Sequence, residues 1–378
     1  METVVYQLAQ GLAHLGFDVR VMAPSRSPGT VIEGNVRFDG VRAAIVSNWI
    51  QVPSYRSIRE LTRGIAWADF VHVHNPYETF CVLASLIALR EKKPLAVSLL
   101  SPGSVRDHPR GGFRLVGRVE ERFLPGILRR ADLVHVKNLR DLATVRPLVP
   151  HAILIPDGVP DELLAAPREA QLFRERRGLV DAFPLVLFLG RLHPLKGPDH
   201  LVRAVALLRE GFPLVGAVIA GPDPDRLTPN LERLARELGV GDRVRFLGMI
   251  SETEKREALD ATDLVVVPSL ADFVEGFSIA ASEAWARGKP VVGYPVGALV
   301  ARIHDGVNGV LAKAVSPAAL AKAMGEALTL REIPVPSDVV GWSTVSSRFA
   351  QEYERRTLRP VLAEGNAAPP VGGAGPPN

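Results

Sequence analysis

The sequence predicts an α/β protein made of two doubly wound, Rossmann-like domains of parallel sheet. Three observations lead to this fold class. Short aliphatic or β-branched runs alternate with helical patterns along most of the chain, as in βαβ units with buried strands. These runs fall into two sets, separated by a segment rich in proline and charge. The length of 378 residues also exceeds the roughly 250–300 residues that one hydrophobic core supports.

The first half begins with a helix rather than with a strand. In "METVVYQLAQGLAHLGFDVRVMAP" the apolar residues follow a helical spacing, and Gly16 marks the stop before a strand. A doubly wound domain ordinarily starts with a strand whose following loop carries phosphate-facing glycines. We therefore expect the first strand of this domain to be missing. Five later strands are predicted, at Asp18–Met22, Phe70–His74, Leu95–Leu99, Leu133–Lys137 and Ile153–Ile155.

The second half repeats the pattern after a linker. The segment "IPDGVPDELLAAPREAQLFRERRGLVDAFP" places the boundary between about Pro156 and Phe183. Domains are thus expected over 1–165 and 180–340, followed by a last helix over about 342–360 and a disordered Pro- and Gly-rich tail over 363–378. Five strands are predicted in the second domain, at Leu185–Leu189, Leu214–Ala220, Val244–Phe246, Leu264–Val267 and Pro290–Gly293.

Composition narrows the class of protein. Hydrophobic residues make up 47% and charged residues 23% of the chain, as in globular proteins. The single cysteine, Cys81, excludes an internal disulfide and a cysteine-rich metal site. No segment reaches the roughly 20 apolar residues that cross a bilayer, and the amphipathic start is unlike a signal peptide. We therefore expect a cytoplasmic protein.

Positive charge is concentrated in the first half, although the net charge is only +4. Between Arg90 and Arg146 there are 13 Lys or Arg against 6 Asp or Glu, a local excess of +7. Such a surface is either an ordinary solvated face or a peripheral contact for an anionic membrane or a phosphorylated acceptor. Nucleic acid is not expected as a partner, because no aromatic platform or known binding module accompanies the charge.

A basic loop follows the first strand of the second domain. In "LVLFLGRLHPLKG" the strand ends at Gly190, and Arg191 and Lys196 come before a helix that starts near Pro198. Ligands of doubly wound sheets bind at the carboxyl ends of the strands. Two cations beside a helix N-terminus suit a diphosphate, which needs charge and directional donors. Taken alone, the stretch is equally compatible with a solvated basic loop.

Two glutamates stand in "DFVEGFSIAASEAWARGKPVV". Glu275 follows a predicted strand, and the free backbone N–H groups of Gly276, Phe277 and Ser278 at the helix start can bind an anion. Glu283 lies about a turn and a half into that helix and can face the same cleft. Carboxylates suit sugar and ribose hydroxyls because each accepts two directional bonds. The alternative is a capping acid followed by an ordinary surface glutamate.

Together these stretches resemble the retaining glycosyltransferases of the GT-B fold, family 4. "GRLHPLKG", "EGFSIAASEAWARGKPVV" and "HDGVNGVLA" carry the resemblance, with "IPDGVP" and "WSTVSSRFAQEYE" on either side. It covers most of the chain and is strongest from Val186 to Leu311. It implies two domains around a cleft and a last helix that crosses back to the first domain.

The resemblance also implies roles in binding a nucleotide-sugar donor. Arg191 and Lys196 would neutralise the diphosphate, so no metal or other cofactor would be needed. Glu275 would hold hydroxyls of the transferred sugar, and Glu283 would hold the ribose. The remaining donor contacts would come from the strand-end loops and the helix start, at Gly190, Gly221, Leu247, Gly248, Met249, Gly276, Phe277 and Ser278.

The first domain supplies acceptor-side candidates and departs from the family pattern. His72 and His74 share one face of a strand, and His74 and Asn75 end it; the alternative is that the histidines are ordinary core or rim residues. Many relatives have a histidine where this chain has Leu100, and a glutamate where it has Ala301. His108, or the polar loop with Ser101 and Ser104, would then meet the donor or acceptor.

We therefore expect a metal-independent retaining glycosyltransferase that acts on an unidentified acceptor, whether lipid, metabolite or glycan. Met1 and Glu2 match only the last part of the glycine loop of relatives, so weak or absent transfer is expected if the chain begins there. Two alternatives stay open: an impaired relative that binds nucleotide sugars without turnover, and a sugar-nucleotide isomerase or epimerase of the same fold.

Overall fold

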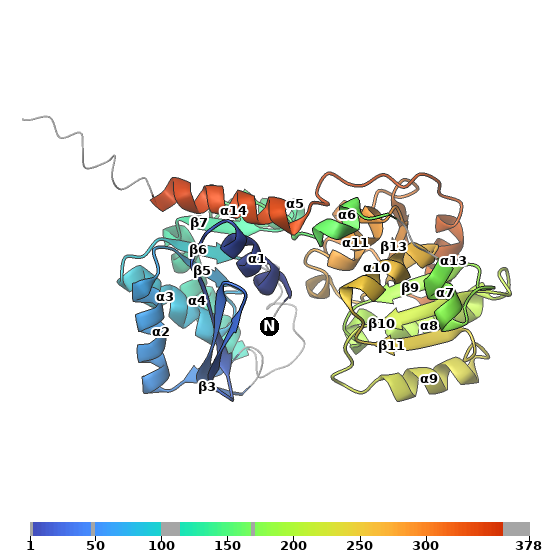
Figure 1. Cartoon of the computed structure of the whole chain (residues 1–378), viewed down its shortest axis with the longest axis horizontal. Coiled ribbons are helices and arrows are strands. Elements are labelled where there is room, and N and C mark those ends of the chain that lie inside the picture. The colour runs from blue at the N-terminus through green and yellow to red at the C-terminus, as the bar shows by residue number, and fades with distance from the viewer. Residues whose placement is uncertain (1–2, 47–49, 100–113, 168–170, 358–378) are drawn as a thin grey trace, which may run out of the picture.

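The computed structural model describes residues 3–46, 50–99, 114–167 and 171–357, which form two lobes (Figure 1). The chain passes from one lobe to the other twice, and the two crossings lie side by side. The Val159 amide donates to the Val340 carbonyl at 2.9 Å, and the Trp342 amide donates to the Val159 carbonyl at 3.0 Å. The predicted α/β class with parallel sheets is confirmed.

The C-terminal lobe contains one six-stranded sheet in the order β11-β10-β9-β12-β13-β14. All five strand pairs are parallel, and helices cover both faces (Figure 1). The strands are β9 (Leu185–Leu189), β10 (Gly216–Ala220), β11 (Val244–Gly248), β12 (Leu264–Val267), β13 (Val291–Gly293) and β14 (Gly309–Leu311). The five predicted strands are present, and only the three-residue β14 was not predicted.

The helices of this lobe connect the strands and fill the linker. They are α6 (Asp161–Ala165), α7 (Gln171–Arg177), η2 (Pro194–Lys196), α8 (Pro198–Leu208), α9 (Thr228–Glu237), α10 (Glu252–Ala261), η3 (Asp272–Val274), α11 (Ile279–Ala286), α12 (Leu299–Arg302) and α13 (Pro317–Ala327). One continuous core lies under them, with Trp285 and Tyr294 among its largest fully buried side chains.

The N-terminal lobe contains two separate sheets. Strands β5 (Val71–His74), β6 (Leu95–Ser98), β7 (Leu133–Val136) and β8 (Ile153–Leu154) are parallel and pair in that order. Strand β1 (Val19–Ser25) instead pairs with β3 (Val36–Ile45), which also pairs with β2 (Gly29–Glu33) and β4 (Gln51–Pro53). Among the described strands none joins β1 to β5.

Strands β2, β3 and β4 were not predicted from sequence. Strand β2 is exposed along its whole length, so it lacks the alternation of a half-buried strand. Strand β3 alternates on either side of Asp39 and Gly40, which interrupt the pattern. The buried Asp39 carboxylate accepts hydrogen bonds from Thr30 at 2.5 Å and from Arg20 at 2.5 Å. These contacts, which join three strands, replace an apolar core at that point.

Helices of the N-terminal lobe are α1 (Thr3–His14), α2 (Tyr55–Trp67), α3 (Thr79–Arg90), α4 (Arg114–Arg130) and α5 (Leu139–Val145). The last helix, α14 (Trp342–Thr357), lies along this lobe although it follows the C-terminal lobe in sequence (Figure 1). Leu8 and Leu12 of α1 share one apolar cluster with Val345 and Phe349 of α14. Hydrophobic burial therefore holds α14 against α1.

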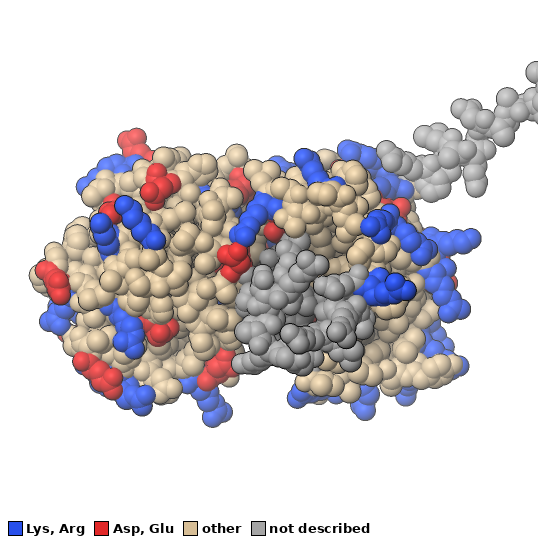
Figure 2. Space-filling view, turned by 180° about the vertical axis from the view of Figure 1, so that it is seen from behind, with Lys and Arg blue, Asp and Glu red and all other residues tan. Residues whose placement is uncertain are grey.

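Charge differs between the lobes. On the face shown in Figure 2, Lys and Arg predominate over the N-terminal lobe, whereas the C-terminal lobe shows both signs. Arg122, Arg129 and Arg130 of α4 are exposed. None of the described helices is long and apolar enough to cross a membrane.

Candidate functional site

The carboxyl ends of β9 and β10 meet at two glycines. The Gly190 amide donates to the Ala220 carbonyl at 3.0 Å. A Cβ on Gly221, whose φ is 143°, would lie 2.0 Å from the Gly190 carbonyl oxygen. Only glycine fits such an approach. The loops after both strands therefore leave the sheet at one edge, where the sequence predicted a ligand.

The basic loop after β9 is pressed against the end of β12. A Cβ on Gly197, whose φ is 64°, would lie 2.2 Å from the Pro268 carbonyl oxygen. This packing directs the Lys196 ammonium to the Val274 carbonyl at 3.2 Å and to the Glu275 carboxylate. Arg191 is exposed, and the described residues give it no hydrogen bond or ion pair.

Glu275 is the most enclosed acid of the site, with 2% of its surface exposed. Its Oε1 accepts a hydrogen bond from Ser269 Oγ at 2.5 Å and another from Lys196. A buried carboxylate without a cation is costly, so Lys196 stabilises Glu275 in this position. The structure thus brings together one predicted cation and one predicted acid that are 79 residues apart in sequence.

The 275–278 turn presents its backbone in one orientation because other groups hold its carbonyl oxygens. Asn138 Nδ2 donates to the Gly276 carbonyl at 2.6 Å, and Arg302 Nη1 donates to the Phe277 carbonyl at 2.6 Å. The other two contacts are Ala298 N to Glu275 O at 2.8 Å and Arg302 Nη1 to Ser278 O at 3.2 Å. Four successive carbonyls are therefore occupied.

The amide groups of the same turn are free. Within the described residues, no acceptor contacts the N–H groups of residues 276 to 279. Ser278 has a left-handed φ of 67°, and its buried hydroxyl has no partner among those residues. Such strain costs about 1 kcal/mol for a residue other than glycine. Free amides, an unpartnered hydroxyl and the positive end of α11 together form an anion-binding arrangement.

Glu283 faces a cation that sequence reasoning missed. It is 5% exposed and pairs with Lys255 of α10 at 2.5 Å, and Lys255 also contacts Glu252 at 2.7 Å. Burial raises the pKa of the Glu283 carboxyl, and the Lys255 charge opposes that rise. Lys255 gave no sequence signal because its partner lies 28 residues away on another helix. No direct contact joins Glu283 to the Lys196–Glu275 pair.

The predicted nucleobase loops lie beside the two glycines. The Gly221 amide donates to the Gly248 carbonyl at 2.8 Å, so the ends of β10 and β11 also meet. Leu247 is half-buried, Gly248 has a left-handed φ of 62°, and Met249 is 79% exposed. The end of β11 therefore offers backbone groups and one exposed apolar side chain.

On the N-terminal side, His74 and Asn75 end β5. The rings of His72 and His74 lie 4.0 Å apart, which confirms that they share a face. Burial, with the nearby Lys137 charge, lowers the pKa of His74 to about 3, so its ring is neutral. Asn75 has a left-handed φ of 59° and donates to Glu78 at 2.9 Å. Ser101, Ser104, Leu100 and His108 lie outside the described residues.

Helix α5 connects the lobes at the 275–278 turn. Besides the Asn138 contact, Arg140 pairs with Asp272 at 2.8 Å and donates to the Gly297 carbonyl at 3.2 Å. The pKa of the Asp272 carboxyl is lowered mainly by the hydrogen bond from the Gly297 amide, and Arg140 lowers it further. Neither Asn138 nor Arg140 was predicted from sequence, since nothing near them in the chain indicates a partner more than 130 residues away. The first lobe thus touches the loop that carries Glu275.

Comparison with known proteins identifies the family. The sequence profile described as "Glycosyltransferase Family 4" matches residues 1–150, and that described as "Glycosyl transferases group 1" matches residues 169–335. The protein named D-inositol 3-phosphate glycosyltransferase 2 of Catenulispora acidiphila is 36% identical over 94% of this chain and 90% of its own. The chain belongs to the group 1 glycosyltransferases.

Further relatives and solved structures agree with this family. A D-inositol 3-phosphate glycosyltransferase of Streptomyces griseus is 29% identical over 93% of this chain and 84% of its own. Sucrose-phosphate synthase from Thermosynechococcus elongatus has the same fold, with a TM-score of 0.71 at 22% identity over 96% of this chain and 93% of that one. Anabaena HepE, solved with UDP-glucose, has a TM-score of 0.67 at 20% identity over 89% of this chain and 99% of that one. The GT-B fold is therefore confirmed.

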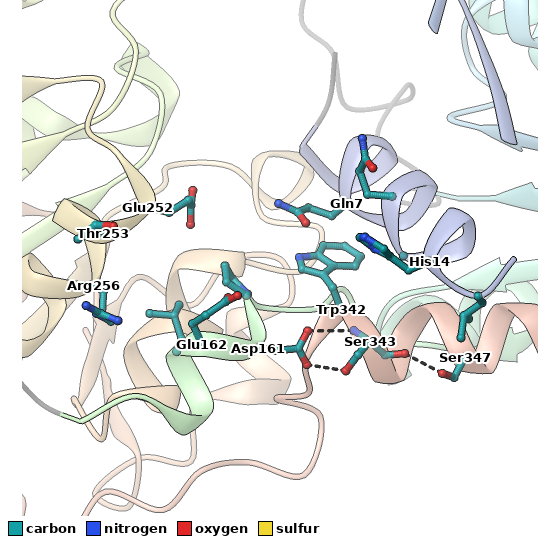
Figure 3. Close-up of a pocket in the computed structure, with 15 residues that line it drawn as sticks. Gln7, His14, Asp161, Glu162, Glu252, Thr253, Arg256, Trp342, Ser343 and Ser347 are labelled. Carbon is teal, nitrogen blue, oxygen red and sulfur yellow. Dashed lines mark hydrogen bonds between the residues drawn. The ribbon is translucent and has the colours of Figure 1, made fainter. Parts of the chain in front are cut away.

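This glycosyltransferase also has a cavity of about 640 Å³ between its lobes (Figure 3). Gln7 and His14 of α1 form one wall, and Thr253 and Arg256 of α10 form the opposite wall. Trp342 stands between them, and Asp161 is held by two contacts with Ser343 (Figure 3). The cavity adjoins Glu252, which pairs with Lys255, the partner of Glu283.

A chain of hydrogen bonds in the N-terminal lobe was also missed. His72 contacts Tyr353 of α14 at 2.6 Å and Ser98 at 2.7 Å, and Ser98 contacts His135 at 2.8 Å. His135 Nε2 lies 2.7 Å from the Ile155 carbonyl, which can only accept. His135 Nε2 is therefore the donor in that contact, and His135 Nδ1 accepts from the Ser98 hydroxyl. Ser98 in turn accepts from His72 Nε2, and His72 Nδ1 accepts from the Tyr353 hydroxyl. Burial lowers the pKa of His135 to about 4.

The glycosyltransferase shows no clustered metal ligands in the part of the chain that the structure describes. His72 of β5 and His135 of β7 are instead engaged in the hydrogen-bonded chain.

Proposed function

We propose that this glycosyltransferase moves a sugar from a nucleotide-sugar donor to a hydroxyl-bearing acceptor and retains the anomeric configuration. The observation that carries the proposal is the contact between Lys196 and Glu275 beside the free amides of the 275–278 turn. A cation and amide N–H groups suit the diphosphate of a nucleotide sugar, and a carboxylate beside them suits its sugar. The diphosphate needs positive charge, and the sugar hydroxyls need acceptors.

The chemistry follows from where charge develops. When the bond between the anomeric carbon and the diphosphate oxygen breaks, the oxygen keeps the electron pair, and the sugar becomes oxocarbenium-like. Lys196, the exposed Arg191 and the turn amides would stabilise the departing diphosphate, as preorganised donors stabilise charge in other active sites. These groups would replace a metal ion in that role. Transfer in the presence of EDTA would support this, and a strict metal requirement would contradict it.

Glu275 would position the sugar rather than attack it. Its Oε1 already accepts from Ser269 and Lys196, whereas Oε2 has no partner among the described residues and remains available for a sugar hydroxyl. Glu283 would bind the ribose by exchanging its contact with Lys255 for hydroxyl groups. We assign no protein nucleophile.

For the donor, we propose a UDP-sugar as the first candidate, because a relative of this fold was solved with UDP-glucose. For the acceptor, the basic N-terminal lobe favours a phosphorylated molecule. D-inositol 3-phosphate is the first compound to test, since the most similar relatives reported above carry it in their names. Lipid and glycan acceptors remain within the proposal.

The decisive experiment is an assay for released nucleoside diphosphate with and without acceptor. UDP-glucose, UDP-N-acetylglucosamine, GDP-mannose and ADP-glucose would be the donors, and NMR of the product would report the anomeric configuration. Acceptor-dependent release with retention supports the proposal. A product of inverted configuration contradicts retention, and a changed sugar still attached to the nucleotide indicates an isomerase.

A second candidate function is nucleotide-sugar binding without turnover. The split sheet of the N-terminal lobe favours it, because β1 and β5 lack a joining strand among the described residues. Saturable binding of a nucleotide sugar with no release of nucleoside diphosphate, across all acceptors tested, would support this candidate over transfer.

We further propose that the protein acts in the cytoplasm and touches anionic membrane surfaces through the basic face of the N-terminal lobe. The local charge excess between residues 90 and 146 supports this. Sedimentation with vesicles of phosphatidylglycerol and phosphatidylcholine would test it. Binding should require the anionic lipid and weaken with salt.

A further inference from the structure

Arg302 is a buried arginine placed directly behind the 275–278 turn. It ends the short helix α12 and is 5% exposed. Its guanidinium uses all three nitrogens: Nη1 donates to Phe277 and Ser278 carbonyls, Nη2 donates to Ser282 Oγ at 2.8 Å, and Nε donates to Asp338 at 2.7 Å. The guanidinium carbon also lies 3.9 Å from the centre of the Phe277 ring.

These contacts determine where the free amides point. In a trans peptide the N–H is directed opposite to the C=O. The carbonyl of Phe277 shares its peptide with the Ser278 amide, and the carbonyl of Ser278 shares its peptide with the Ile279 amide. Arg302 holds both carbonyls on its side, and the Ala281 and Ser282 amides also donate to the Ser278 carbonyl. Both N–H groups therefore face away from Arg302, toward the side on which no protein acceptor is described.

The electrostatics of this arrangement favour an anion. Arg302 places a positive charge beside the N-terminus of α11, which is already the positive end of that helix. A charged donor also polarises the peptide it binds, and this strengthens the N–H at the other end of the same peptide. The left-handed Ser278 with its unpartnered hydroxyl is the strained residue between the two held peptides. An anion on the amide side would be stabilised by all of these features.

We propose that Arg302 is a positioning residue for the diphosphate of the donor, acting through the two peptides it holds in the 275–278 turn. The inference rests on the proposed nucleotide-sugar function and names a residue to which that function assigned no role. Arg302 itself does not touch the ligand. Lysine cannot replace it. A planar guanidinium reaches two carbonyls, a serine hydroxyl and Asp338 at once, whereas a single ammonium cannot.

Arg287, at the C-terminal end of α11, provides a matched control. It is also buried, and it also combines an aspartate with backbone carbonyls: Asp260 at 2.7 Å, Leu163 at 2.9 Å and Ala166 at 2.8 Å. Its contacts hold the linker rather than the 275–278 turn. Arg287→Lys should therefore lower thermal stability without a selective effect on a diphosphate.

The test compares full-length wild type with Arg302→Lys, Asp338→Asn and Arg287→Lys. Calorimetry would measure the binding of UDP, of uridine and of inorganic pyrophosphate, and hydrogen exchange would follow the Ala281 and Ser282 amides, which donate to the Ser278 carbonyl of the turn. For Arg302→Lys we expect roughly tenfold weaker binding of UDP and of pyrophosphate, which corresponds to the loss of one charge-assisted contact. The affinity for uridine should stay within about twofold of wild type. The Ala281 and Ser282 amides should exchange faster. Asp338→Asn should show the same pattern more weakly.

Two outcomes would overturn the inference. One is UDP binding by Arg302→Lys within about twofold of wild type, with unchanged exchange of the Ala281 and Ser282 amides. The other is an equal loss for UDP and uridine, which would indicate general damage. If wild type binds none of the three probes, the proposed function is wrong instead. Unchanged hydrogen exchange of the same two amides in Arg302→Lys would then still refute the positioning role.

Discussion

Replacement of Lys196 by Met tests the pair on which the proposed site depends. The change removes the ammonium at nearly constant volume and leaves Glu275, which is 2% exposed, with only its Ser269 contact. Removing one partner of a buried ion pair costs about 3–5 kcal/mol. The Lys196 side chain is 25% exposed, so water reaches the pair, and we expect about 2–3 kcal/mol.

The assay is thermal unfolding of the single variants and of the double variant Lys196→Met/Glu275→Gln. For a domain of this size each kcal/mol shifts Tm by about 2–4 °C, so Lys196→Met should lower Tm by about 5–10 °C. The double variant has no buried charge left unpaired. Its loss should fall short of the sum of the single losses by about 1–3 kcal/mol. Release of UDP from the donor should fall by about 10²–10³-fold in Lys196→Met.

Lys322→Met is the matched control. Lys322 is 71% exposed and lies 4.0 Å from Glu326, four residues along α13. An exposed pair of this kind is worth about 0.5 kcal/mol or less, so neither Tm nor activity should change measurably. Additive losses in the double variant, within about 0.5 kcal/mol, would refute the coupling of Lys196 to Glu275.

Three further predictions concern the surroundings of the site. Gly297→Ala should destabilise the protein and weaken UDP binding, because its Cβ would lie 2.3 Å from a carbonyl of the 275–278 turn; Gly178→Ala, at a similar φ of 64° with open space, should cost only about 1 kcal/mol and leave binding unchanged. Asn138→Ala should raise the donor KM about threefold to tenfold through loss of its contact across the lobes, with little change in the Tm of the C-terminal lobe; an unchanged KM would contradict a role for that contact. Stability should fall as pH drops from about 6.5 to 4, because the folded-state pKa of His135 is about 4 and the unfolded chain therefore binds this proton first. His72 and His74, whose pKa values burial also lowers, add to the loss. His135→Asn should reduce the loss at pH 5 by about 2 kcal/mol, and an unchanged loss would contradict the assignment.

The carboxyl ends of the strands were predictable because buried parallel strands are continuous apolar runs. Gly190 and Glu275 each follow such a run, so both could be placed at one edge of the sheet before the structure was known. The same reasoning failed for β3, where Asp39 is buried and satisfied by side chains from other strands. A pattern of apolar residues carries no information about a polar group that is buried with its partners.

The residues that the sequence did not reveal share one property. Lys255, Asn138 and Arg302 each gain their role from a partner that is distant in sequence, a carboxylate or a backbone carbonyl. Backbone carbonyls occur at every residue, so no spacing of residue types indicates which one a side chain will meet. Arg287 and Arg302 look alike in sequence, and only their neighbours show that one holds the linker and the other holds the turn.

By itself the sequence determined the alternation of strands and helices, the two lobes and the family, because these follow from local periodicity and from short motifs. Only the tertiary structure decided that Lys196 reaches Glu275, that Glu283 faces Lys255, and that four successive carbonyls of the 275–278 turn are held from behind. The physical reason is range. Hydrophobic periodicity acts within one element, whereas the charge pairs and hydrogen bonds of the site exist only after elements far apart in the chain have packed together.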